Sequence, residues 1–239
     1  MIPVEVCIDC SDASAALASA SAAQNGGASR IECCSAMDVG GLTPDAKVIS
    51  SLSKSVGEEL EILAMIRPRG GDFDYSEAEI AKMIESMSEM ASSGAHGVVF
   101  GVEKEGELAQ EALESLVQAA KMLSLSVTFH RAYDALTAPH QFLDSIIRSG
   151  CDRVLTAGVP WGDKRDAVSG VVGLNKTHFT ALGRIEVVVG GGVTPSNAGS
   201  ILSRISPPSA LSFHAYSSVR TDGVTDEKKV RALVKSLSR

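Results

Sequence analysis

Short runs rich in Val, Ile and Leu recur along the chain, and a segment with helical periodicity follows each of them. One such segment places Ile80, Met83, Ile84 and Met87 on a single helix face. The expected strands are Val4–Asp9, Arg30–Cys34, Ile62–Ile66, Gly97–Gly101, Leu125–His130, Arg153–Thr156, Ile185–Gly190 and Leu211–His214. Parallel strands need crossover connections, usually helices, so this alternation predicts parallel pairing. Eight even units favour closure over an open doubly wound sheet. We therefore predict an α/β fold, a (β/α)8 TIM barrel, in a single domain over residues 1–239.

The two faces of the expected strands differ in polarity. In the first strand, one face carries Glu5, Cys7 and Asp9, whereas the other face is aliphatic. The aliphatic face should meet the helices, because a charge trapped between sheet and helix would lack a partner. The same argument turns these side chains inward: Glu32, Cys34, Met65, Arg67, Ser126, Thr128, His130, Thr156, Ser212 and His214. Buried ionisable groups cluster at functional sites, so we predict a polar pocket at the C-terminal ends of the strands. A structural ion-pair network around Arg67 is the alternative, chiefly for Glu5, the deepest member.

The third expected strand ends in the run Met65–Phe73, which contains two arginines and a Gly-Gly turn. Arg67 and Arg69 could bind a carboxylate or phosphate, because a guanidinium group matches the geometry of both anions. Alternatively, Arg67 pairs with Glu32 while Arg69 and Asp72 hold the loop together.

Two further features are candidates for anion binding. Gly191 and Gly192 follow the seventh expected strand and precede a helix start at Thr194. In barrels, the loops after strands seven and eight often bind phosphate through backbone N–H groups at a helix N-terminus. A tight turn is the alternative reading of these glycines. Arg131, which follows the fifth strand, adds a cationic candidate.

His130 and His214 end the fifth and eighth expected strands. An imidazole at the C-terminal end of a barrel strand could act as a general base or as a metal ligand, and Glu32 or Asp9 would tune its proton affinity. Together with the arginines, these residues predict an enzyme that acts by acid–base chemistry on a small anionic metabolite. The alternative for each histidine is a satisfied polar residue without a catalytic role.

Cys7 and Cys34 should point inward from adjacent strands, which lie roughly 4.8 Å apart in a sheet. Two soft thiolates at that separation could share a Cu(I) ion, whereas a tetrahedral zinc site would need more ligands than the pair provides. The alternative is that each buried cysteine behaves as a small hydrophobic residue. The chain has five cysteines, an odd number, and begins without a recognisable signal peptide. We therefore expect reduced thiols in a cytoplasmic protein.

The charge balance limits the class of partner. The chain carries 29 acidic and 22 basic residues, for a formal net charge of −7. Nucleic acids and anionic membranes both require a basic surface, so neither is an expected partner. No apolar stretch approaches the roughly 18 residues of a membrane span. The expected partners are therefore a copper ion, a small anionic ligand, or both.

Several of these runs together resemble the copper homeostasis protein CutC family. The resemblance rests on EVCID, RIECCS, GGLTP, MIRPRGGDF, TFHRAYD and RVLTAG, with GGGV and FHA further on, and it spans nearly the whole chain. It implies a single cytoplasmic (β/α)8 barrel, a possible homodimer, and copper bound by Cys7 and Cys34. The segment 216–226 looks shorter than in relatives of the family, so the contacts that it makes are the least predictable from the resemblance.

The favoured prediction is a CutC-like, cytoplasmic Cu(I)-binding protein with the metal held by the thiolates of Cys7 and Cys34 at the barrel mouth. The alternative is the TIM-barrel enzyme on a small carboxylate or phosphate metabolite, which accounts better for the ionisable residues inside the barrel. A purely structural or scaffolding barrel is the third possibility, and it leaves the polar interior without a purpose.

Overall fold

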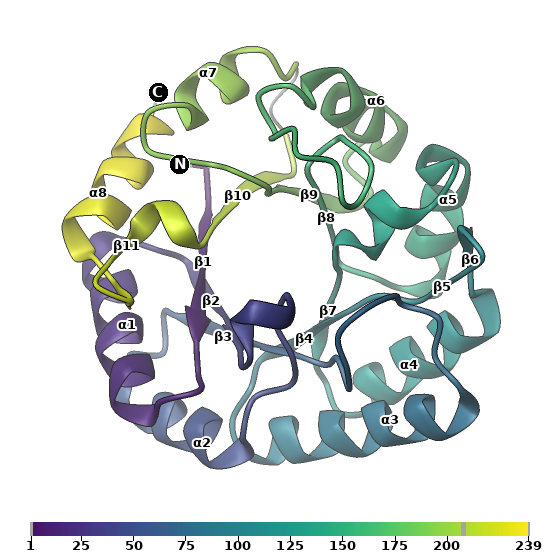
Figure 1. Cartoon of the computed structure of the whole chain (residues 1–239), viewed down its shortest axis with the longest axis horizontal. Helices are drawn as coiled ribbons and strands as arrows, with labels where there is room; N and C mark the ends of the chain where they lie inside the picture. The colour runs from purple at the N-terminus through teal and green to yellow at the C-terminus, as the bar shows by residue number, and fades with distance from the viewer. Residues whose placement is uncertain (1, 207–208, 239) are drawn as a thin grey trace.

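The structure, a computed structural model, describes residues 2–206 and 209–238. In this part of the chain, eight parallel strands form a closed barrel surrounded by helices (Figure 1). The barrel strands are β1 (Val4–Asp9), β2 (Arg30–Cys34), β3 (Glu61–Met65), β4 (Gly97–Phe100), β7 (Ser126–Phe129), β8 (Arg153–Thr156), β9 (Glu186–Val189) and β10 (Leu211–Ala215). They pair in the order β1-β10-β9-β8-β7-β4-β3-β2, and β1 closes the ring between β10 and β2. The predicted (β/α)8 barrel is confirmed.

The helices lie outside the strand ring, one after each barrel strand (Figure 1). They are α1 (Ala13–Gly26), α2 (Ala46–Ser55), α3 (Glu77–Ser92), α4 (Gln110–Met122), α5 (Pro139–Ser149), α6 (Val171–Ala181), α7 (Ala198–Ser203) and α8 (Glu227–Ser236). Local sequence fixes several of their ends. Ser76 and Glu79 form a capping box that starts α3, and Gly27 ends α1 in the left-handed region at φ 91°.

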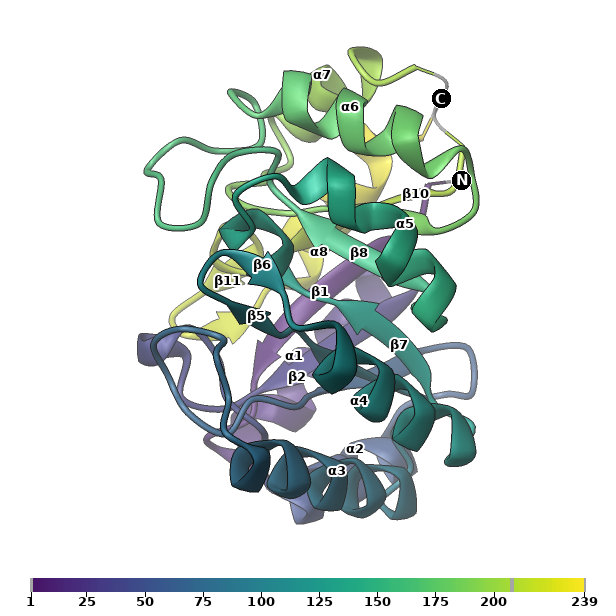
Figure 2. The ribbon, with the colours of Figure 1, turned by 90° about the vertical axis from the view of Figure 1, so that its right-hand side faces the viewer.

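Short elements occupy the loops between the main strands and helices. They are the 3-10 turns η1 (Met37–Val39), η2 (Arg131–Ala135) and η3 (Ser217–Val219), the hairpin β5 (Glu103–Lys104) with β6 (Glu107–Leu108), and the hairpin β11 (Arg220–Thr221) with β12 (Val224–Thr225). The sequence pattern predicted neither hairpin. The segment 216–226 therefore contains η3 and a hairpin whose second strand packs against α1. Figure 2 shows the loops after β2 and β8 projecting from the same end of the barrel.

The strand faces divide as predicted from their polarity. The aliphatic side chains of β1 belong to the large core between sheet and helices, together with Ile31 and Cys33 of β2. A second, smaller cluster fills the barrel interior and contains Cys7, Cys34, Leu63, Met65 and Val99. The inward placement of both cysteines is therefore confirmed.

An ion-pair network closes the end of the barrel interior where the strands begin. Arg30 of β2 donates to Glu5 at 2.7 Å and to Ser212 at 2.6 Å, and it also pairs with Glu186. Arg153 continues the network to Glu61 and Glu186, as two ion pairs of 2.9 and 3.7 Å show. The alternative interpretation placed a structural ion-pair network around Arg67, but the network is centred on Arg30, which has the same strand parity as Glu32 and Cys34.

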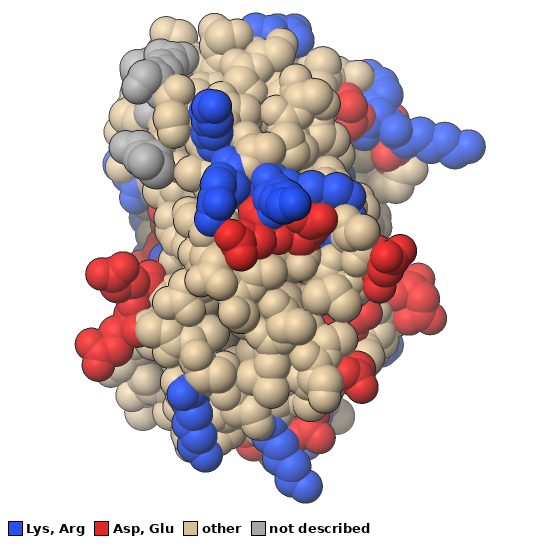
Figure 3. Space-filling model, turned by 90° about the vertical axis from the view of Figure 1, so that its left-hand side faces the viewer, with Lys and Arg blue, Asp and Glu red and all other residues tan. Residues whose placement is uncertain are grey.

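Two surface properties bear on the partners of this protein. Among the described residues, no helix combines the length and the apolar character needed to cross a bilayer. On the face shown in Figure 3, which α1 and α8 cover, Lys and Arg side chains lie beside Asp and Glu side chains. The α8 pair Arg231–Glu227 at 2.6 Å is an example. This face is therefore not a continuous basic surface of the kind that nucleic acid requires.

Candidate functional site

A cavity of about 170 Å³ lies at the C-terminal mouth of the barrel, where barrel enzymes place their active sites. It is lined by seven of the candidate site residues predicted from sequence: Cys7, Glu32, Cys34, Arg67, His130, Arg131 and His214. These side chains come from β1, β2 and β10 and from the segments that follow β3 and β7. The structure therefore brings the predicted thiol, acid, histidine and arginine groups to one pocket.

The thiols and a carboxylate form the tightest group in this pocket. The Sγ atoms of Cys7 and Cys34 lie 3.9 Å apart, and Cys34 Sγ lies 3.6 Å from Glu32 Oε2. One ligand atom from each of these three buried residues lies within 4.8 Å of the other two. The thioethers of Met37 and Met65 belong to the same interior cluster, so the pocket floor is rich in sulfur.

Both thiols hold their protons tightly in the absence of a metal. The hydrogen bond with Cys34 lowers the pKa of Cys7, but burial and the Glu32 carboxylate outweigh it and raise that pKa to about 12. The hydrogen bond with Cys7 and burial raise the pKa of Cys34 well above its usual range. A metal bound here must displace protons, and this makes its affinity depend on pH.

His214 is fixed between two carboxylates. Its Nδ1 lies 2.7 Å from Glu5 Oε1, and its Nε2 lies 3.9 Å from Glu32 Oε2. Burial lowers the pKa of His214, but Glu32 and Glu5 outweigh burial and raise it. Burial raises the pKa of Glu5, but the Arg30 guanidinium and His214 lower it to about 2, so Glu5 is ionised at neutral pH. Glu5 therefore sets the orientation of the imidazole that faces the pocket.

His130 presents a hydrogen-bond donor to the pocket. Its Nδ1 accepts the backbone N–H of Ala132 at 3.1 Å, so the proton of the neutral ring is on Nε2. Burial and the Arg67 guanidinium lower the pKa of His130 to about 3, so the ring is neutral at physiological pH. Within the described residues, neither His130 Nε2 nor Arg67 Nε has a hydrogen-bond partner, although both atoms are buried. Two residues that line the pocket thus each carry a buried donor without a hydrogen-bond partner.

Arg67 holds the mouth loops as well as lining the pocket. Its guanidinium donates to the carbonyl oxygens of Gly40 and Gly71 at 3.2 and 2.8 Å, and it lies over the Phe73 ring. Glu32, which the alternative interpretation paired with Arg67, is not among these contacts. Arg67 therefore joins the loops after β2 and β3 and leaves its Nε free.

Four predicted residues are not brought to the pocket. Arg69 pairs with Glu79 at 2.6 Å and with Asp72 at 2.9 Å, so the expectation that it joins Arg67 at one anion site is not met. Arg69 does not line the pocket, and its pairing with Asp72 is the loop-holding role given as the alternative. Asp9 accepts the backbone N–H of Ser11 outside the pocket lining.

The loop after β9 does not line the pocket itself, but it borders Arg131, since a Cβ on Gly191 would lie 3.7 Å from Arg131 Cζ. Gly191 and Gly192 both have positive φ angles, as a tight turn requires. The Gly191 carbonyl accepts the N–H of Ala167, and the Gly192 carbonyl accepts the side-chain amide of Asn197. Anion binding by this loop stays a prediction.

The pocket also contains residues that the strand pattern did not predict. Met37 in η1, Trp161 after β8 and Tyr216 after β10 all line the cavity. Trp161 contacts Phe73 edge-on and stacks against Arg131, and these residues form one wall of the mouth. Their sequence signal is position alone, since loops at the C-terminal ends of barrel strands are where barrel sites are built.

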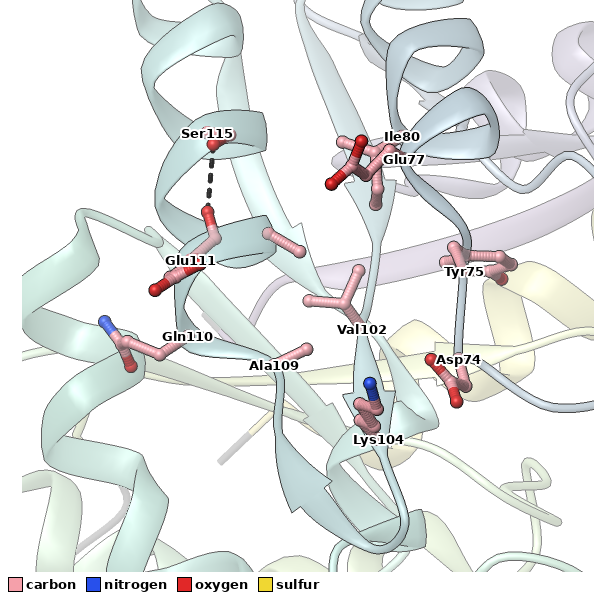
Figure 4. Close-up of a pocket in the computed structure, with 11 residues that line it drawn as sticks. Asp74, Tyr75, Glu77, Ile80, Val102, Lys104, Ala109, Gln110, Glu111 and Ser115 are labelled. Carbon is pink, nitrogen blue, oxygen red and sulfur yellow. Dashed lines mark hydrogen bonds between the residues drawn. The ribbon is translucent and has the colours of Figure 1, made fainter.

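A larger surface groove, of about 530 Å³, lies outside the barrel. Figure 4 shows its lining side chains, which come from the first turns of α3 and α4 and from the neighbourhood of β5. Ile80, Val102 and Ala109 are apolar members, and Glu77 and Lys104 lie among the polar ones. None of the predicted site residues lines it, and neither metal-ligating group found among the described residues includes its side chains. The chemistry of the candidate site is therefore at the barrel mouth.

Known proteins are similar to this chain in sequence and in fold. A model of the CutC family matches residues 2–207. A CutC family protein of Parabacteroides distasonis is 39% identical over 180 residues, which cover 75% of this chain and 71% of that protein. The copper homeostasis protein cutC homolog of Homo sapiens is 36% identical over 237 residues, 98% of this chain and 81% of that protein. The structure of CutC from Streptococcus agalactiae matches with a TM-score of 0.79 and 27% identity, covering 90% of this chain and 98% of that one. The chain belongs to the CutC family, which is implicated in copper homeostasis.

Proposed function

We propose that this protein binds Cu(I) in the cytoplasm through the thiolates of Cys7 and Cys34. The observation that carries the proposal is the pair of buried sulfur atoms 3.9 Å apart at the pocket floor. Thiolates and thioethers are the soft ligands that select Cu(I) over harder cations. The copper homeostasis name of the human relative supports the same metal.

The spacing of the two sulfurs favours a third ligand. With a metal–sulfur bond of about 2.3 Å, the zinc–thiolate value, linear coordination would separate the sulfurs by about 4.6 Å and trigonal coordination by about 4.0 Å. The observed 3.9 Å is close to the trigonal value. A methyl group built on Gly41 would lie 3.3 Å from Cys34 Sγ and 3.6 Å from Met37 Sδ, so both sulfurs face that glycine. Met37 is therefore the candidate for a third soft ligand.

The test is Cu(I) affinity, measured by competition with a calibrated chelator under reducing conditions. The chain offers a matched control, because Cys10 and Cys33 form a second buried thiol pair on the helix side of the barrel wall. We expect stoichiometric Cu(I) binding that the Cys7→Ser, Cys34→Ser variant loses and the Cys10→Ser, Cys33→Ser variant keeps. Equal affinity in wild type and the first variant would refute the proposal.

A second function is favoured by the unsatisfied donors at His130 Nε2 and Arg67 Nε. A neutral imidazole N–H and a guanidinium N–H on one wall suit a carboxylate or phosphate oxygen. In this function, the pocket binds a small anionic metabolite and His214 transfers a proton.

Thermal-shift screening of carboxylates and phosphates should yield a ligand whose stabilising effect Arg67→Ala and His130→Ala both reduce. Arg69→Ala is the matched control, because Arg69 lies outside the pocket lining. Ligands that stabilise all of these variants equally would argue against this function.

A further inference from the structure

One carboxylate oxygen in the pocket is left without a partner. Glu32 is only 3% exposed, and its Oε1 makes no hydrogen bond within the described part of the chain. Its Oε2 lies 3.6 Å from Cys34 Sγ and 3.9 Å from His214 Nε2. A buried carboxylate oxygen without a partner is costly, and buried polar atoms of this kind are uncommon in folded proteins. A Cu(I) ion held by sulfur alone would leave the whole Glu32 carboxylate without a metal contact.

We propose that Cys7, Cys34, Glu32 and His214 form a site for a divalent metal of the zinc class, with Glu5 orienting His214 from behind. The proposal rests on the same thiol pair as the proposed copper site, and it adds an oxygen and a nitrogen ligand to that pair. The protein then binds two kinds of metal in one place. Cu(I) uses the sulfur atoms, whereas the divalent ion uses all four side chains.

Three distances between the proposed ligand atoms can be compared with the edges of a tetrahedral zinc site. Zinc bonds of about 2.3 Å to sulfur and about 2.1 Å to oxygen or nitrogen give tetrahedral edges of about 3.8 Å for S···S, about 3.6 Å for S···O and about 3.4 Å for N···O. The structure has 3.9 Å between the two sulfurs and 3.6 Å between Cys34 Sγ and Glu32 Oε2. The His214 Nε2 to Glu32 Oε2 distance of 3.9 Å is longer than the ideal edge by about 0.5 Å. Cys7, Cys34 and Glu32 thus present an S₂O face within 4.8 Å, whereas His214 is grouped with Glu32 but not with the thiols and has to move toward them on binding.

Glu32 joins two groups of ligands. The first contains Glu32, Cys7 and Cys34, and the second contains Glu32, Glu5 and His214. In the second group, Glu5 Oε1 holds His214 Nδ1 at 2.7 Å, while Arg30 holds the other oxygen of Glu5 at the same distance. Metal-binding histidines commonly hold a carboxylate on the ring nitrogen that faces away from the metal. Glu5 has that position, so His214 Nε2 is the nitrogen left to bind.

The charge of the site also favours a divalent ion. With both thiols and the Glu32 carboxyl deprotonated and His214 neutral, the site carries three negative charges, and Arg30 already pairs with Glu5. A divalent ion leaves one negative charge in this buried site, whereas Cu(I) leaves two. An uncompensated buried charge is strongly destabilising, so the ion of higher charge is the better match for all four side chains.

The experiment uses Zn²⁺ and Co²⁺ with the reduced, metal-free full chain. Co²⁺ reports thiolate coordination through its sulfur-to-metal charge-transfer absorption, and competition by Zn²⁺ gives the zinc affinity. Glu32→Gln and His214→Gln remove one ligand each and keep the side-chain volume. Glu61→Gln is the matched control, because it removes a carboxylate from the network at the opposite end of the barrel. Cu(I) affinity is measured on the same four proteins, and circular dichroism confirms that each one folds.

We expect wild type to bind one Zn²⁺. Glu32→Gln and His214→Gln should each weaken Zn²⁺ binding by about 100-fold or more, which exceeds the usual effect of losing a residue that only hydrogen-bonds a metal ligand. Cu(I) affinity should change by less than about tenfold, because soft thiolates dominate its binding. The proposal is overturned if Glu32→Gln and His214→Gln both bind Zn²⁺ as tightly as Glu61→Gln does. It is also overturned if wild type binds Cu(I) but not Zn²⁺. If Zn²⁺ binding requires Glu32 but the Cys7→Ser, Cys34→Ser variant binds Cu(I) as tightly as wild type, the copper function alone is overturned. Should Glu32→Gln fail to fold, His214→Gln decides the test.

Discussion

The neutral state of His130 should be visible in the pH dependence of stability. His130 is 5% exposed, and its Nδ1 already accepts the N–H of Ala132. Burial and the neighbouring Arg67 guanidinium lower its pKa from 6.5 to about 3. The unfolded chain takes up a proton at this residue near pH 6.5, and the folded chain does not. The stability that the neutral ring contributes is therefore complete above pH 6.5 and is lost as the pH falls toward 3.

The size of the effect follows from the two pKa values. Each pH unit below 6.5 removes about 1.4 kcal/mol from the free energy of unfolding until the folded protein itself takes up the proton. At about pH 5 the loss is about 2 kcal/mol, and above about pH 7.5 it is negligible. Because His130 is buried, solvent screening does not reduce this figure appreciably.

The assay compares wild type with His130→Gln by urea unfolding between about pH 7.5 and about pH 5. The amide oxygen of Gln can still accept the Ala132 N–H, and Gln does not titrate. His214 and the carboxylates titrate in both proteins, so their contributions cancel in the difference. We expect the stability of wild type relative to His130→Gln to fall by about 2 kcal/mol across this range. A difference that stays constant with pH would refute the assignment of His130 as a buried neutral group.

Three further substitutions test other parts of the barrel. Arg30→Met should lower the free energy of unfolding by about 3–5 kcal/mol in urea titrations, because it leaves Glu5 buried without its cation. Arg69→Ala should cost less than about 1 kcal/mol in the same assay, since its ion pairs are partly exposed. Gly41→Ala should lower both Cu(I) affinity and stability, because its φ of 87° disfavours a side chain and the methyl group would crowd Cys34 Sγ. A Gly41→Ala protein that binds Cu(I) like wild type would exclude crowding at that sulfur.

The barrel and the inward face of its strands were predictable because alternation leaves few choices. In β1 one face is charged and the other aliphatic, so only one orientation buries the aliphatic face against helices. The same parity in β2 placed Glu32 and Cys34 inside, and it applies equally to Arg30, whose inward position was overlooked. With Arg30 included, a buried cation next to Glu5 would have been predicted from the parallel register.

The loops were less predictable because side-chain parity ends where the strand ends. Arg67 and Arg69 share parity, yet only Arg67 lines the pocket, because the backbone after β3 turns through a Gly-Gly segment before Asp72. The long-range pairs at the barrel floor, such as Arg153 with Glu61, depend on the closure of the ring and have no local signal. The four residues of the proposed zinc site were all predicted to lie inside. Their mutual distances, which decide between a thiol pair and a four-ligand set, required the structure.

The wall that Trp161 forms at the pocket mouth supplies an optical probe of this site. The chain contains a single tryptophan, and its indole stacks on Arg131 and contacts the Phe73 edge, within the lining of the cavity. Its ring is partly exposed, so its emission depends on the water and charge around it. All tryptophan fluorescence of the protein therefore originates at the entrance to the pocket. A titration can follow metal or ligand entry in the unlabelled chain, without a background signal from any other indole.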